Sequence, residues 1–271
     1  EHEHKARTIL GKIDFAYHAF YFPELVLYTD YDNFLISITR YVKEPLSFLK
    51  HSNIEQFFMV IRAFEAQTGV QITTYSHRQK IKRVFGIIKA EEYIQESDRL
   101  VDNIIKNNNV NFDILNKAKL FIAENKTTLE TYGDFLTHSD FVPHNLRVVD
   151  ARLYLLDHTS IHFGNKYEGW ARFMNYMIIY NPTLELYLKK YIENNRNKDE
   201  YLALRLMRVY KLLFLMNYYC NSIDKAKGNL NILTRKRIVF WQTVLNSILK
   251  NQDFDQSVTK EYKKNRDSLR S

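Results

Sequence analysis

Helical periodicity runs through most of this sequence and is interrupted in one place, and this pattern constrains the fold more than any other feature. In residues 54–67, IEQFFMVIRAFEAQ, apolar side chains recur at intervals of three or four, the spacing that buries one face of a helix. We expect helices there and in further segments with the same spacing: 80–106, 112–124, 183–193, 199–222 and 230–250. Only 138–163 interrupts it. With 271 residues, 45% of them hydrophobic, the chain can bury a substantial core.

Strand signals lie mainly ahead of these helices. A short helical start at 1–10 is followed by β-prone runs at 25–30 (LVLYTD) and 34–42 (FLISITRYV). Between the two runs the sequence DYDN is rich in turn-forming residues. Strands followed by a long helical remainder predict a mostly helical α+β fold.

A second hairpin is expected inside the interruption. The runs NLRVV (145–149) and RLYLLD (152–157) flank Asp150 and Ala151, a connection short enough to close a tight hairpin. If residue 149 pairs with 152, residue 145 lies opposite 156. Asn145 and Asp157 would then meet at the open end of the hairpin.

The residues with the clearest chemistry begin just before this hairpin, in HSDFVPHN (138–145). Asp140 precedes Asn145 by five positions, the D-x-x-x-x-N spacing that phosphoryl-transfer enzymes use for a base and a metal ligand. A carboxylate can accept the proton of an attacking hydroxyl, and Mg²⁺ prefers hard oxygen donors. Asp140 suits the first task, and Asn145 and Asp157 suit the second. Taken alone, Asp140 and Asn145 also fit a turn with side-chain caps.

The segment resembles the catalytic loop of the aminoglycoside phosphotransferase and choline kinase group, whose fold is that of the protein kinases. That group's motif reads approximately H-G-D-x-H-P-x-N, then a hairpin, then an apolar run ending in Asp. The resemblance implies that Asp140 is the catalytic base, that His138 braces the loop, and that Asn145 and Asp157 bind Mg²⁺. It also implies ATP as a cofactor and a small-molecule hydroxyl as the phosphate acceptor.

Flanking segments extend the resemblance. FGNKYEGWARF (163–173) is similar to the family segment in which a glycine and an acid open a helix; here the acid is Glu168, where Asp is usual. FLISITRYVKEPLSFL (34–49) resembles the last strand of the small lobe and the hinge, where the backbone of Tyr41 and Val42 would meet adenine. The implied division is a partial small lobe at 1–42, a helical large lobe at 43–250 and a polar tail at 251–271.

The small lobe departs from the family pattern. A complete one has a glycine-rich phosphate loop and a strand Lys that pairs with a helix Glu. The glycines of this sequence form no G-x-G, and too few residues precede the hinge to hold three strands. Glu1 or Glu3 would be the helix acid. We expect a small-molecule kinase represented by a fragment, with a truncated small lobe whose missing strands can abolish activity; the alternative is a natural short relative that has lost ATP chemistry.

Other functions stay open. A non-catalytic kinase-like binding module is the main alternative. The formal net charge of +8 favours anionic partners, but cations gather only in HRQKIKRVF (77–85), whose spacing fits a solvated helix face. Nucleic-acid binding there, through Lys80, Lys82 and Arg83, is a less favoured third candidate. One cysteine, Cys220, and the lack of a long apolar stretch fit a cytoplasmic protein without a membrane span.

Trp170 and Trp241 lie in helical patterns and are expected to pack in a core or on a lobe surface. Glu168 fits either a first-turn acid favoured by the helix dipole or a residue with a structural or substrate role.

Overall fold

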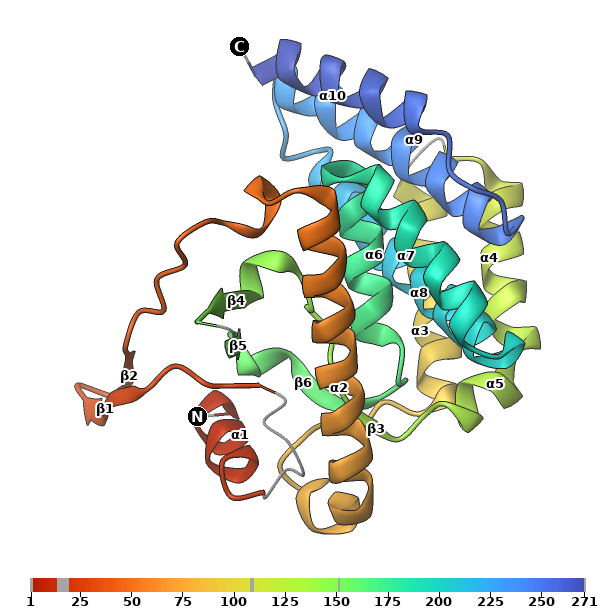
Figure 1. Cartoon of the computed structure of the whole chain (residues 1–271). Coiled ribbons are helices and arrows are strands. Elements are labelled where there is room, and N and C mark those ends of the chain that lie inside the picture. Colours follow the sequence, from red (N-terminus) through yellow and green to blue (C-terminus); the bar gives the residue numbers. More distant parts are fainter. Residues whose placement is uncertain (1, 14–19, 108–109, 151, 271) are drawn as a thin grey trace. The chain divides into compact units, whose positions relative to one another are not determined.

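The computed structural model describes residues 2–13, 20–107, 110–150 and 152–270 (Figure 1). The chain divides into two compact units. The first unit comprises Glu1–Ile88 and Gly133–Phe173, and the second comprises Lys89–Tyr132 and Met174–Ser271.

The first unit holds all the strands of the described residues. They pair as antiparallel two-stranded sheets, β1 with β2, β3 with β6 and β4 with β5. The strands are β1 (Leu25–Tyr31), β2 (Phe34–Thr39), β3 (Phe135–His138), β4 (Leu146–Val149), β5 (Arg152–Leu155) and β6 (Ile161–Gly164). Its helices are α1 (His2–Leu10), α2 (Asn53–Ile81), the start of α6 (Glu168–Tyr180), and the 3₁₀ turns η1 (Phe48–Lys50), η2 (Pro143–Asn145) and η3 (His158–Ser160).

The hairpin β1–β2 turns at Asp32 and Asn33, whose φ angles are 49° and 65°. A type I′ hairpin turn has positive φ at both central residues, and Asp and Asn tolerate this better than most residues. The DYDN turn is therefore confirmed. Large apolar side chains of this hairpin are exposed, including Val26 at 59% and Phe34 at 70%.

Helix α2 begins with a capping box, in which the Ser52 side chain accepts a hydrogen bond from the Glu55 N–H and the Glu55 carboxylate accepts one from the Ser52 N–H. The helix ends at Ile81, so the prediction of one helix over 80–106 is wrong. The intervening backbone pairs with β6 instead: Phe163 N–H donates to the Gly86 carbonyl at 2.7 Å, and Ile88 N–H to the Phe163 carbonyl at 2.8 Å.

The second unit is helical throughout its described elements. These are α3 (Ala90–Asn107), α4 (Phe112–Glu124), α5 (Lys126–Thr131), the remainder of α6, α7 (Pro182–Asn195), α8 (Lys198–Ser222), α9 (Asn229–Leu249) and α10 (Gln256–Arg270). The helices expected at 112–124, 183–193, 199–222 and 230–250 are confirmed, and so is the mostly helical α+β class. The segment expected to be a polar tail contains α10, whose Tyr262 stacks on Phe240 of α9 with ring centroids 4.6 Å apart.

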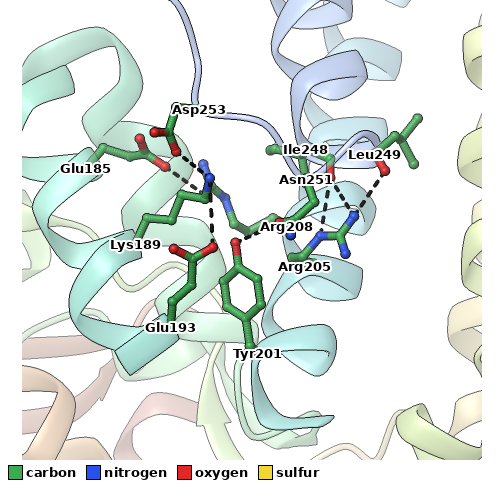
Figure 2. A network of polar contacts seen from close by, with 10 residues as sticks. All are labelled: Glu185, Lys189, Glu193, Tyr201, Arg205, Arg208, Ile248, Leu249, Asn251 and Asp253. Carbon is green, nitrogen blue, oxygen red and sulfur yellow. Dashed lines mark hydrogen bonds and ion pairs between the residues drawn. The ribbon is translucent and has the colours of Figure 1, made fainter. Parts of the chain in front are cut away.

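Buried charges connect α7, α8 and the chain after α9 in the second unit (Figure 2). The Arg208 guanidinium lies 2.7 Å from the Glu185 carboxylate, and both residues are 5% exposed. Lys189 pairs with Asp253 at 2.5 Å. Arg205 donates to the carbonyl groups that end α9. Arg208 and Glu185 therefore balance each other's charge, as buried ions require.

Both tryptophans are buried as expected, Trp170 at 2% and Trp241 at 3% exposure. Trp170 stacks on Phe64 of α2 with centroids 4.2 Å apart.

Among the described residues, none of the helices is both long enough and apolar enough to span a bilayer.

Candidate active site

The loop that carries Asp140 leaves the β3–β6 sheet at a fixed point. His138 is the last residue of β3 and lies opposite Ile161 of β6. The next residue, Ser139, donates its N–H to the Ser160 carbonyl at 2.9 Å. The loop therefore starts from a paired strand, which fixes the direction in which the chain reaches Asp140.

The β4–β5 hairpin has the predicted register. Val149 lies opposite Arg152, and the Leu156 N–H donates to the Asn145 carbonyl at 2.8 Å. The turn residue Asp150 has a φ of 47°, which an aspartate adopts with less strain than most residues. Asn145 is thus bonded to the residue directly before Asp157.

Asp140 and Asn145 are joined side chain to side chain. The Asn145 Nδ2 donates to the Asp140 Oδ2 at 3.1 Å and to the Asp140 carbonyl at 2.9 Å. The 3₁₀ turn that starts at Pro143 makes this possible, because its Asn145 N–H donates back to the Val142 carbonyl at 2.9 Å. Asn145 is only 7% exposed. With Nδ2 used on Asp140, its Oδ1 is left as an acceptor or cation ligand.

Arg172 of α6 holds the other carboxylate oxygen of Asp140. Its Nε lies 2.9 Å from Oδ1. Burial alone would raise the pKa of Asp140, but Arg172, with smaller contributions from His144 and His138, lowers it overall. Asp140 is therefore ionised at neutral pH. Arg172 lies within the 163–173 segment but was not predicted as a site residue, because an arginine at a helical position carries no signal of what it faces.

His138 connects the start of the loop to the end of the hairpin. Its Nε2 lies 3.1 Å from the Leu156 carbonyl, and since a carbonyl only accepts, Nε2 carries the proton. Burial lowers the pKa of His138 to about 4, and the hydrogen bond to the Leu156 carbonyl, with the charges of Asp157 and Asp140, only partly opposes this. His138 is therefore neutral, and its bond spans from β3 to the residue before Asp157.

Asp157 has a left-handed backbone, with φ 53° and ψ 66°. Its Oδ1 accepts a hydrogen bond from the Thr159 hydroxyl. The following residue, His158, is 1% exposed, and its Nδ1 lies 3.6 Å from the Glu3 carboxylate of α1. The nearby His158 is the main reason that the pKa of Glu3 is lowered. These contacts hold the chain directly after Asp157.

Tyr41 and Val42, the residues predicted to bind adenine, lie between the end of β2 and Glu44, which contacts β4. Tyr41 is 79% exposed. Three residues later, Glu44 accepts a hydrogen bond from the Val148 N–H at 3.2 Å and lies 3.5 Å from Arg147. The contact attaches this segment to β4. The adenine-binding role of Tyr41 and Val42 stays a prediction.

The first turn of α6 packs against the strands beside the loop. Glu168 is 1% exposed, and its Oε2 lies 2.9 Å from the His162 Nε2 of β6. A Cβ added to Gly169 would lie 2.5 Å from the Gln67 amide nitrogen and 3.0 Å from the His138 carbonyl. A larger residue than glycine would require Gln67 to move and would crowd the His138 carbonyl. Glu168 has a structural contact in addition to its first-turn position.

Asn145 and Asp157 offer the oxygen donors that Mg²⁺ prefers. Groups of three or more His, Cys, Asp or Glu side chains able to hold a metal ion do not occur among the described residues. Mg²⁺ in nucleotide sites needs only one or two protein ligands beside the phosphates, so the donor set of Asn145 and Asp157 fits it.

Comparisons with known proteins bear on the fold. No protein-family model and no curated protein sequence matches the chain. Solved structures do match. A thermostable mutant of aminoglycoside phosphotransferase APH(4)-Ia, in a ternary complex with ADP and hygromycin B, has a TM-score of 0.54 at 14% identity, covering 92% of this chain and 82% of the other.

Two further solved structures resemble this chain to a similar degree. Macrolide 2′-phosphotransferase type I has a TM-score of 0.55 at 12% identity, covering 88% of this chain and 77% of the other. The streptomycin–ATP–APH(2″)-IIa ternary complex has a TM-score of 0.52 at 14% identity, covering 88% and 79%. This chain therefore has the protein-kinase-like fold of the aminoglycoside phosphotransferases, mostly helical with small antiparallel sheets.

Proposed function

We propose that this protein is an ATP- and Mg²⁺-dependent phosphotransferase whose acceptor is a hydroxyl group of a small molecule. One observation carries the proposal: Asn145 bonds Asp140 through its side chain and, through its backbone, the residue before Asp157. These bonds bring Asp140, Asn145 and the backbone of Asp157 together at one end of the β4–β5 hairpin, and the three residues have the chemistry of a base and two cation ligands.

Asp140 is the proposed catalytic base. Its side chain is 33% exposed, so an acceptor hydroxyl can reach it, and its lowered pKa keeps it ionised. A carboxylate of low basicity suits phosphoryl transfer, whose loose transition state needs orientation of the hydroxyl more than early removal of its proton. His138 braces the loop through its bond to the Leu156 carbonyl.

Asn145 and Asp157 are the proposed ligands of Mg²⁺. Bound together with ATP, the cation would neutralise charge on the phosphate oxygens. The Oδ1 of Asn145 is the oxygen available for this, since Nδ2 is bonded to Asp140. Asp157 offers the oxygen that Thr159 does not contact. The backbone of Tyr41 and Val42 would bind adenine.

The choice of a small-molecule acceptor is supported by the neighbours, which are phosphotransferases recorded with hygromycin B or streptomycin. The formal net charge of +8 of this chain disfavours a polycationic acceptor. Sugars, amino alcohols and hydroxy amino acids are therefore the acceptors to try beside aminoglycosides and macrolides.

A non-catalytic binding module with the same fold is the second candidate. The observation that favours it is the absence of any G-x-G phosphate loop from the sequence. In that case the site would hold a ligand without transferring phosphate.

Release of ADP from Mg·ATP in the presence of an acceptor panel tests the proposal. Asp140→Asn should lower turnover by about 10²- to 10⁴-fold, the usual contribution of a general base. Asp150→Asn is the matched control: it makes the same change at the hairpin turn, where asparagine tolerates the positive φ equally well. Its turnover should equal that of the wild type.

The second candidate predicts a different result. Wild-type protein that gives no Mg²⁺-dependent turnover with any acceptor and does not bind Mg·AMP-PNP in calorimetry would refute the phosphotransferase. Circular dichroism of each variant, unchanged from the wild type, excludes loss of folding as the cause.

A further inference from the structure

Three contacts join the start of α6 to the catalytic loop and to the neighbouring strands β3 and β6. Glu168 pairs with His162 at 2.9 Å, Gly169 lies against the His138 carbonyl, and Arg172 pairs with Asp140 at 2.9 Å. Residues 168 and 172 are four apart and so lie on one face of the helix. The contacts of Glu168 and Gly169 hold that face against β6 and β3. The packing of the helix therefore sets the position of the Arg172 guanidinium beside Asp140.

The Asp140 carboxylate is held at both oxygens. Arg172 Nε donates to Oδ1 at 2.9 Å, and Asn145 Nδ2 donates to Oδ2 at 3.1 Å. One donor on each oxygen fixes the plane of the carboxylate, whereas a single donor would leave it free to rotate. The arginine supplies its bond from a helix that is itself docked, whereas Asn145 supplies the other bond from the loop.

We propose that Arg172 is a positioning residue: it holds the Asp140 carboxylate in the orientation in which that carboxylate receives the proton of the acceptor hydroxyl. This role rests on the phosphotransferase function proposed above. It extends the site to a residue 32 positions beyond Asp140 in the chain.

The role follows from the transfer step. The acceptor O–H bond breaks and its proton passes to Asp140, while the acceptor oxygen forms a bond to the γ-phosphorus of ATP. The electron pair of the broken P–O bond stays on the leaving ADP oxygen. Asp140 must point at the acceptor before this happens, and a misplacement of about 1 Å can cost about 10²-fold in rate.

Kinetics of Arg172→Met and Arg172→Lys with Mg·ATP test the inference, with choline, homoserine and hygromycin B as acceptor probes. Arg172→Met should lower kcat about 100-fold, while KM for ATP stays within about 2-fold, because the residue contacts the base and not the nucleotide. Arg172→Lys should recover about 10-fold of that loss, since an ammonium keeps the charge but not the directed Nε–H bond.

Arg78→Met is the matched control. Arg78 is 30% exposed, close to the 29% of Arg172, lies in the same unit, and pairs with Asp134 at 3.3 Å away from the loop. Its kcat should stay within about 2-fold of the wild type. Wild-type kcat in Arg172→Met, or an equal loss in Arg78→Met, would overturn the inference.

Crystal structures of the wild type and Arg172→Met give a readout that does not need turnover. The inference expects the Asp140 carboxylate to rotate in the variant while the backbone of the loop stays in place; an unchanged carboxylate would overturn it. If the wild type shows no turnover but the carboxylate rotates, the phosphotransferase proposal fails and the orienting role of Arg172 stands.

Discussion

Arg208→Met is expected to be among the most destabilising substitutions in the second unit. Arg208 and Glu185 are each 5% exposed and lie 2.7 Å apart (Figure 2). Methionine keeps most of the aliphatic length of the side chain, so little packing is lost. What is lost is the partner of the Glu185 carboxylate, and breaking one side of a buried ion pair costs about 3–5 kcal/mol.

A second bond of Arg208 adds to this cost in the same direction. Its Nε donates to the Asn175 Oδ1 at 3.0 Å, which the substitution leaves without that donor. The Asn175 Nδ2 keeps its bond to the backbone carbonyl of residue 208 at 2.9 Å. The total loss in the free energy of unfolding should therefore lie near the upper end of the range for the ion pair.

Urea unfolding followed by circular dichroism measures the change in the free energy of unfolding. Lys117→Met is the matched control, because Lys117 pairs with Asp113 at 2.6 Å in the same unit but the two side chains are 62% and 68% exposed. An exposed pair of this kind contributes about 0.3–0.5 kcal/mol. The double variant Glu185→Leu with Arg208→Met should recover most of the stability, since it leaves no buried charge unpaired. A loss below about 1 kcal/mol in Arg208→Met would refute this reasoning.

Two further predictions concern residues beside the catalytic loop. Because burial lowers the pKa of His138 from 6.5 to about 4, the unfolded chain binds more protons between these values, so up to about 3 kcal/mol of stability present above pH 6.5 should be lost as the pH falls towards 4. Urea unfolding at pH 7 and 4.5 should show this loss in the wild type and a smaller one in His138→Gln; equal losses would contradict it. Gly169→Ala should cost about 1–3 kcal/mol, because its Cβ would lie 2.5 Å from the Gln67 amide and 3.0 Å from the His138 carbonyl. A melting temperature equal to that of the wild type would show that α6 can move away from β3.

Local signals predicted the hairpin and most helices correctly, for physical reasons. The β4–β5 register follows from the two-residue connection, which leaves a single pairing that keeps Leu153 and Leu155 buried. The helices of the second unit follow from apolar spacing, which a packed helix must have. The grouping of Asp140 and Asn145 follows from their separation within one short loop.

Features that depend on distant partners were not predictable. Apolar spacing continues past Ile81, but the backbone there finds its hydrogen bonds on β6, which no local pattern records. Arg172 looks like any helical arginine until Asp140, far away in the sequence, is placed beside it. Helix α10 has a polar composition, and its packing rests on a few side chains such as Tyr262. The catalytic roles of His138, Asp140, Asn145 and Asp157 stay predictions.

The hydrogen bond between Asn145 and Asp140 makes the proposed base and a proposed cation ligand a single mechanical unit. A change of metal ion that shifts the asparagine would also turn the carboxylate, so charge neutralisation and proton acceptance would fail together. Rate losses measured separately at the two positions would then overlap, and their free energies could not be summed.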